Sequence, residues 1–100
     1  MKLPKQLIIA GHKIPIRYRK RIVENGVKCW GLYDPNRQII YLAYGMPDTQ
    51  KMEIVLHEII HAIEHIHVLP TSEKTVKTLG IEILAVIRNN KLNFLGGLKK

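Results

Sequence analysis

The chain of 100 residues has one cysteine, Cys29, and no long apolar run. A single cysteine cannot form an internal disulfide, which excludes the small secreted folds that depend on such bonds. Charged residues or histidines interrupt every apolar stretch before it reaches the length of a membrane-spanning helix. Residues 1–6 lack the apolar segment and the cleavage site of a signal peptide. We therefore expect a single domain over residues 1–100, located in the cytoplasm, without a membrane span.

Acidic residues are also scarce, because 8 Asp and Glu stand against 16 Lys and Arg, and the formal net charge is +8. Such a charge suits nucleic acid, anionic membranes or acidic substrates. The densest basic run, residues 17–21, is typical of a solvated strand end or turn. Both predicted helices are needed for the core and for a metal site, so no recognition helix remains and we do not expect a nucleic-acid partner.

Residues 1–47 predict two β-hairpins. Pro15 favours an edge position or a break in its strand, because proline cannot donate a hydrogen bond to a neighbouring strand. Asn25-Gly26 and the sequence Asp-Pro-Asn-Arg at residues 34–37 predict turns. The strand-like segments are residues 7–10, 13–19, 27–33 and 38–44.

Two helices follow the predicted hairpins. Asp48 is expected to be the N-cap of a helix within residues 48–68, which Leu69-Pro70 ends. Thr71 or Ser72 then caps a second helix within residues 71–90, and residues 91–100 form an apolar tail. The fold class is therefore α+β, with a three- to four-stranded, mainly antiparallel sheet packed on the two helices.

Residues 57–61 read His-Glu-Ile-Ile-His, the HExxH pattern, within the first predicted helix. Residues four apart lie on one helix face, so the imidazoles of His57 and His61 can hold one metal ion beside Glu58. Neutral imidazole suits zinc among the common metals. At 100° per residue the two histidines lie at the edge of the apolar face, as a metal on a cleft floor requires. A pair of buried core histidines is the structural alternative.

A catalytic zinc ion needs a third protein ligand and an open fourth position. We favour Glu73, which lies at the centre of the apolar face of the second helix, where an unpaired carboxylate is costly. Gly80 on the same face would let the helices approach closely. His65 and His67 are the alternatives; His67 has the spacing of HExxHxxGxxH, but Glu64 stands at its glycine position.

The HEIIH motif, followed by Glu-Lys-Thr-Val-Lys-Thr-Leu-Gly on the next helix, resembles the gluzincin pattern HExxH…ExxA[DN]xxA. The short chain is similar to the minigluzincins, which are soluble, single-domain versions of the catalytic domains of integral-membrane metallopeptidases. The strands just before the motif are also similar to those of compact prophage-type peptidases. The resemblance covers roughly residues 31–90, and HExxH is its specific part.

The resemblance implies that His57, His61 and Glu73 bind Zn²⁺ and that Glu58 is the general base. The chain departs from the pattern at Lys77, where gluzincins have an Asp or Asn that orients a ligand histidine. The implied activity is zinc-dependent endopeptidase cleavage of a peptide or protein, in which Glu58 activates a water molecule at the zinc.

A peptidase also needs a donor for the developing oxyanion and a place for its substrate. We expect residues 38–44 to form the cleft rim, where an extended substrate adds to the strand edge. The candidate oxyanion donors are Tyr41, Tyr44, His65 and His67.

Two other functions remain open. The first is a latent or non-catalytic zinc-binding scaffold, whose cleft is blocked by the tail at residues 91–100 of its own chain or of a neighbour in a homo-oligomer. The second is a basic nucleic-acid-binding module, which the run at residues 17–21 would serve.

Overall fold

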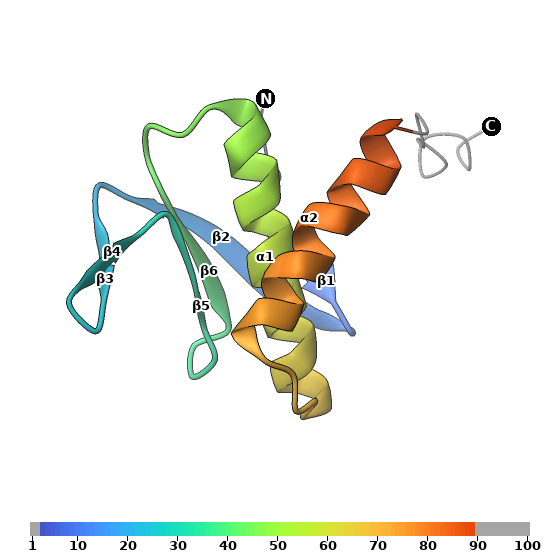
Figure 1. Ribbon diagram of the computed structural model, residues 1–100. Helices are drawn as coiled ribbons and strands as arrows, with labels where there is room; N and C mark the ends of the chain where they lie inside the picture. Colours follow the sequence, from blue (N-terminus) through green and yellow to red (C-terminus); the bar gives the residue numbers. More distant parts are fainter. Residues whose placement is uncertain (1–2, 90–100) are drawn as a thin grey trace.

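The computed structural model describes residues 3–89, in which strands are followed by two helices (Figure 1). The strands are β1 (Gln6–Ile9), β2 (His12–Arg19), β3 (Ile22–Glu24), β4 (Val27–Cys29), β5 (Gly31–Asp34) and β6 (Ile39–Ala43). The helices are α1 (Asp48–His67) and α2 (Glu73–Asn89). The expected α+β class is therefore confirmed.

Four strands form one sheet in the order β1-β2-β6-β5. The pairs β1/β2 and β5/β6 are antiparallel, while β2 and β6 run parallel. β2 connects the β1/β2 hairpin to the β5/β6 hairpin, because its first half pairs with β1 and its second half pairs with β6. The predicted sheet size and its mainly antiparallel character are confirmed, and the parallel pair makes the sheet mixed.

Pro15 lies within a continuous β2, so the expected strand break is wrong. The expected edge position holds locally, because Pro15 pairs with β1 on one side and with none of the described strands on the other. It is the last β2 residue that pairs with β1, and Ile16 is the first that pairs with β6. The backbone N–H of Ile16 donates to the carbonyl of Lys5 at 2.8 Å. The N–H that proline lacks therefore falls where β2 changes partners, which explains why an inner strand tolerates it.

The predicted strand at residues 27–33 is interrupted at Trp30, and its two parts belong to different sheets. β4 pairs with β3 in a separate hairpin, whose turn residues Asn25 and Gly26 both have positive φ, 51° and 79°. Ile22 and Cys29 of this hairpin pack with Tyr41 on one face of the sheet.

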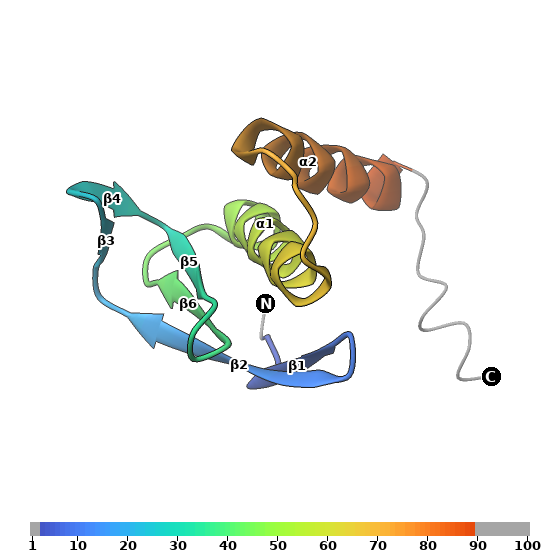
Figure 2. The ribbon, with the colours of Figure 1, turned by 90° about the horizontal axis from the view of Figure 1, so that it is seen from below.

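α1 lies on the opposite face of the sheet, and α2 packs on α1 (Figure 2). Isoleucines alternate along β2 so that Ile14 and Ile16 both point into this layer. Gly80 of α2 lies against the backbone of α1, since a Cβ there would be 3.6 Å from the backbone nitrogen of His57. The expected close approach of the helices is confirmed. The buried core residues are Ile9, Ile14, Ile16, Tyr33, Ile40, Leu42, Met46, Val55 and Ala62.

The helix ends differ slightly from expectation. Pro47 is the N-cap of α1, without a side-chain hydrogen bond, and Asp48 is the first helical residue. The predicted N-cap was therefore wrong by one position, although a carboxylate in the first turn still complements the helix dipole. Ser72 does cap α2, because its Oγ accepts the backbone N–H of Thr75 at 3.2 Å.

The predicted tail at residues 91–100, with its blocking and oligomer-forming roles, lies outside the described residues. Within residues 3–89, neither helix is long and apolar enough to cross a membrane.

Candidate metal centre

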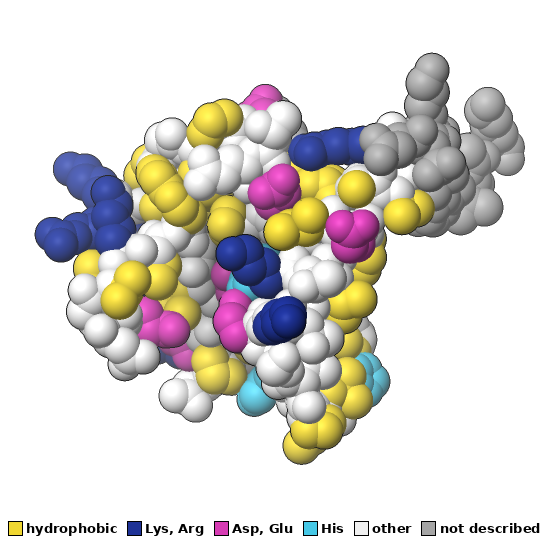
Figure 3. All heavy atoms as spheres, viewed as in Figure 1, with side chains coloured by type: hydrophobic (Ala, Val, Ile, Leu, Met, Phe, Trp, Pro, Cys, Tyr) yellow, Lys and Arg dark blue, Asp and Glu magenta, His cyan; other side chains and the backbone are white. Residues whose placement is uncertain are grey.

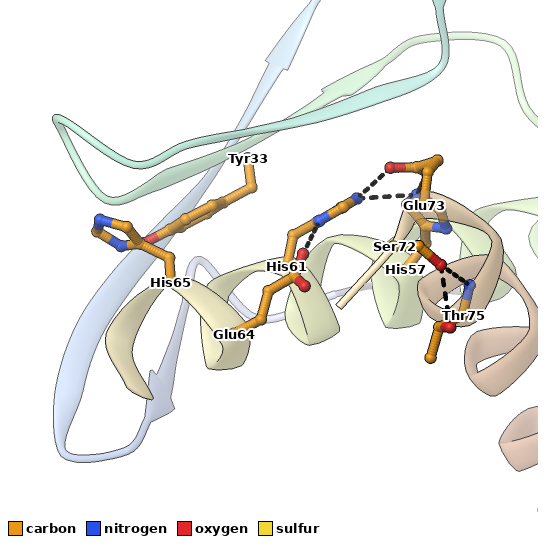
Figure 4. A network of polar contacts seen from close by, with 8 residues as sticks. All are labelled: Tyr33, His57, His61, Glu64, His65, Ser72, Glu73 and Thr75. Carbon is orange, nitrogen blue, oxygen red and sulfur yellow. Dashed lines mark hydrogen bonds and ion pairs between the residues drawn. The ribbon is translucent and has the colours of Figure 1, made fainter. Parts of the chain in front are cut away.

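α1 and α2 bring two histidines and a glutamate together. His57 and His61 lie one turn apart on α1, with their Nε2 atoms 3.2 Å apart. Glu73, in the first turn of α2, places Oε1 2.6 Å from His57 Nε2 and Oε2 3.0 Å from His61 Nε2 (Figure 4). Among the described residues, this is the group of His, Cys, Asp and Glu side chains close enough to hold a metal ion.

The connection between the helices explains how Glu73 reaches the histidines. α1 ends at His67, and Val68 adopts a left-handed conformation with φ 54°. The backbone N–H of Leu69 then donates to the carbonyl of Glu64 at 2.8 Å, which folds the chain back on α1. Residues 68–72 return along the last turns of α1, so α2 begins beside α1 and not beyond its end (Figure 1). Its first residue, Glu73, is thereby within reach of both histidines.

The donor set fits a catalytic-type metal site. Two imidazoles and one carboxylate are the protein ligands of a hydrolytic zinc site with one open position. Two donors on a tetrahedral ion, each about 2.0–2.1 Å from it, lie about 3.3 Å apart. The observed separations of 2.6–3.2 Å reach that value with movements below 1 Å. Glu73, whose side chain is 67% exposed, leaves one side of the group open to solvent.

The alternative third ligands do not join this group. His65 Nδ1 lies 3.2 Å from the hydroxyl of Tyr33. His67, the last residue of α1, is exposed. Neither belongs to the group whose donor atoms converge, so the structure favours Glu73 among the three candidates.

Glu58 is the buried charged residue of the described chain, only 6% exposed. Burial raises the pKa of Glu58 to about 7, although the charge of His61 and a hydrogen bond from the backbone N–H of Tyr33 oppose this shift. The nearby carboxylates of Glu73 and Glu24 add to it. A carboxyl whose pKa lies near neutrality can both take up and release a proton at physiological pH.

The raised pKa predicts a pH-dependent stability in the metal-free protein. The folded state holds the Glu58 proton more tightly than the unfolded state, whose pKa is near 4.5. This stabilisation is complete below pH 4.5 and is lost as the pH rises through about 7. Relative to Glu58→Gln, the wild-type free energy of unfolding should therefore fall by about 3 kcal/mol between pH 4.5 and about pH 8.

Urea unfolding of both proteins with a chelator present measures this difference. The glutamine variant is the control, since it keeps the other titrating groups of the site. Parallel pH profiles for the two proteins would contradict the assignment of the pH dependence to Glu58.

The group of His57, His61 and Glu73 lies in a cleft with α1 as its floor. β5 and the β3–β4 hairpin form one side, and the start of α2 forms the other. The edge strand beside the site is β5, because β6 lies between β2 and β5 in the sheet. The prediction that residues 38–44 form the rim of the cleft is therefore wrong, because β6 in that segment is an inner strand of the sheet.

Only one of the four predicted oxyanion donors lines the cleft, namely His65. Tyr41 is buried in the cluster beneath the β3–β4 hairpin, and Tyr44 stacks on Tyr18 with ring centroids 5.3 Å apart. Tyr33, which the sequence reasoning did not single out, lines the cleft and contacts His65 (Figure 4). One sequence signal could have pointed to Tyr33 as a cleft residue, namely its place in a predicted strand just before the predicted turn at residues 34–37.

The cleft is acidic although the chain is basic. Asp and Glu side chains gather between the strands and α2, with histidine and lysine beside them, while other Lys and Arg side chains project from the far end of the sheet (Figure 3). The glutamates that line the cleft are Glu24, Glu53, Glu58, Glu64 and Glu73.

Comparison with known proteins finds no family model that matches the chain, no curated protein with a matching sequence and no solved structure with a matching fold.

Proposed function

We propose that this protein is a zinc-dependent endopeptidase of the gluzincin type. The observation that carries the proposal is the convergence of His57, His61 and Glu73 beside the buried carboxyl of Glu58. The order of these residues, an HExxH helix followed by a glutamate on the next helix, is the order that the gluzincin resemblance implies. His57, His61 and Glu73 are the proposed zinc ligands.

Zinc at this site supplies Lewis acidity, which lowers the pKa of water and polarises a carbonyl group. Glu58 acts as the general base, because its carboxylate can take the proton of the attacking water and pass it to the leaving amine. The burial that raises the pKa of Glu58 to about 7 also limits the access of competing water to its carboxyl. His65 and Tyr33, which also line the cleft, are the candidates to donate a hydrogen bond to the oxyanion.

The substrate in this proposal is an extended peptide along β5. An edge strand offers backbone groups to an added strand, and residues of β5 line the cleft next to α1. Two further glutamates in the cleft, Glu24 and Glu53, favour peptides with Lys or Arg near the cleaved bond. Such peptides are the first substrates to assay.

Removing the proposed third ligand tests the site directly. The wild-type protein should bind one zinc ion per chain. Glu73→Ala should weaken zinc binding by at least about 100-fold, because losing a ligand costs more affinity than the 10–100-fold lost when a residue that only supports a ligand is changed. Competition with a chromophoric chelator measures the affinity. Glu82→Ala is the matched control, because Glu82 is an exposed glutamate on the same helix. Wild-type protein without stoichiometric zinc would end the proposal.

A further inference from the structure

We propose that Glu64 is the residue that orients His61 for metal binding, in place of the Asp or Asn whose position Lys77 occupies. The inference rests on the metal site of the proposed function, but it does not depend on peptidase activity. Its basis is a contact that the sequence pattern did not predict, between Nδ1 of His61 and the Glu64 carboxylate.

The two ring nitrogens of His61 face different groups. Nε2 lies 3.0 Å from Glu73 and 3.2 Å from Nε2 of His57, so it belongs to the converging donor atoms. Nδ1, across the ring, meets Oε1 of Glu64 (Figure 4). Both ring nitrogens therefore face a carboxylate, but only Nε2 lies among the converging donors. A metal shared by Nε2 and Glu73 would leave Nδ1 to Glu64, which is the arrangement that fixes metal-bound histidines.

With a metal on the Nε2 side, this contact would decide which nitrogen carries the proton. A neutral imidazole has one proton, on either nitrogen, and only the bare nitrogen can bind a metal. A carboxylate at Nδ1 accepts a hydrogen bond from that nitrogen and thereby keeps the proton there. Nε2 is then left with its lone pair toward His57 and Glu73. The same hydrogen bond makes the ring a stronger ligand.

The position of Glu64 is well suited to this role. It lies three residues after His61 on α1, so the two side chains are neighbours on the helix surface. Its side chain is only 16% exposed, which limits competition from water. Its carbonyl accepts the N–H of Leu69 where α1 ends, so the turn that returns the chain to Glu73 also fixes the backbone of Glu64.

Lys77 cannot take this role. Its ammonium group has three donors and no acceptor, so it cannot hold a protonated Nδ1. Lys77 lines the cleft from α2, whereas Glu64 reaches His61 from α1. In this proposal Glu64 compensates, from within the HExxH helix itself, for the departure from the gluzincin pattern at Lys77.

The test measures zinc affinity in Glu64→Ala and Glu64→Gln by competition with a chromophoric chelator at pH 7. Glu64→Ala should bind zinc about 10–100-fold more weakly than the wild type. Glu64→Gln keeps an acceptor oxygen without the charge, so its loss should be smaller. Glu53→Ala, which removes another cleft glutamate from α1, should stay within about 2-fold of the wild type.

Two readouts separate a positioning role from a structural one. Circular dichroism of the metal-free variants should match the wild type. The visible absorption bands of bound Co²⁺, which report ligand geometry, should change in Glu64→Ala and return toward the wild-type spectrum in Glu64→Gln. If Glu64→Ala binds zinc within about 2-fold of the wild type with the same Co²⁺ spectrum, the inference is wrong, and it is also wrong if Glu53→Ala loses as much affinity.

These outcomes are distinguishable from failure of the proposed function. If wild-type protein binds zinc but cleaves no peptide, the peptidase proposal fails while the affinity loss in Glu64→Ala still supports the role of Glu64. If the wild type is active and Glu64→Ala keeps its zinc affinity, only the role of Glu64 is rejected.

Discussion

Replacing Glu58 with glutamine should lower the rate of peptide cleavage by at least about 100-fold while one zinc ion per chain still binds. The amide has nearly the same shape as the carboxyl but cannot accept the proton of the attacking water. Because Glu58 is not among the three converging donors, its loss leaves the ligand set complete. Cleavage of Lys- and Arg-containing peptides, followed by mass spectrometry, measures the rate, and elemental analysis measures the zinc.

Glu82→Gln is the matched control for this experiment, since it removes an exposed carboxylate from the far side of the neighbouring helix. It should leave both activity and zinc content unchanged. Activity of Glu58→Gln near the wild-type level would remove Glu58 from the mechanism, even if zinc is bound.

Adding a single methyl group at Gly31 should destabilise the fold by about 1–3 kcal/mol and disturb the site. A Cβ on Gly31 would clash with Cγ2 of Ile54 and would lie 3.3 Å from both Cγ and Oε2 of Glu58. β5 would have to move away from α1 to make room, and this movement would change the surroundings of the Glu58 carboxyl. Urea unfolding of Gly31→Ala measures the loss of stability, and the cleavage assay measures the effect on the site.

Two variants show whether the loss comes from this clash. In Gly80→Ala, the added Cβ has only ordinary contacts, the nearest at 3.6 Å, so the higher helix propensity of alanine should leave the protein equally or more stable. Ile54→Ala removes the atom that a methyl at Gly31 meets, so the two substitutions combined should destabilise less than the sum of the separate changes. Strict additivity would show that Gly31→Ala acts by another route.

Much of the helical part could be predicted because its signals are local. Three such signals are the HExxH spacing, the end of α1 before Leu69-Pro70 and the cap of α2 at Thr71 or Ser72. Each depends on residues within about two turns of one another. The face of α2 that carries Glu73 also followed from the period of 3.6 residues, and Val76 on that face is buried.

The sheet was predicted less completely because pairing joins segments distant in sequence. The parallel register of β2 and β6 has no local signal, so neither the place of β6 inside the sheet nor the edge position of β5 could be foreseen. The break at Trp30 has the same origin, because residues on its two sides pair with different partners.

By itself, the sequence determined the helix that carries His57, Glu58 and His61, since the spacing of three side chains on one helix follows from helix geometry alone. Only the tertiary structure decided whether a carboxylate of the second helix reaches the two histidines, because this depends on how the connection folds back. The returning connection brings Glu73 to both Nε2 atoms. Glu64, by contrast, lies three residues after His61 on the same helix, so helix geometry alone already places its carboxylate near that ring.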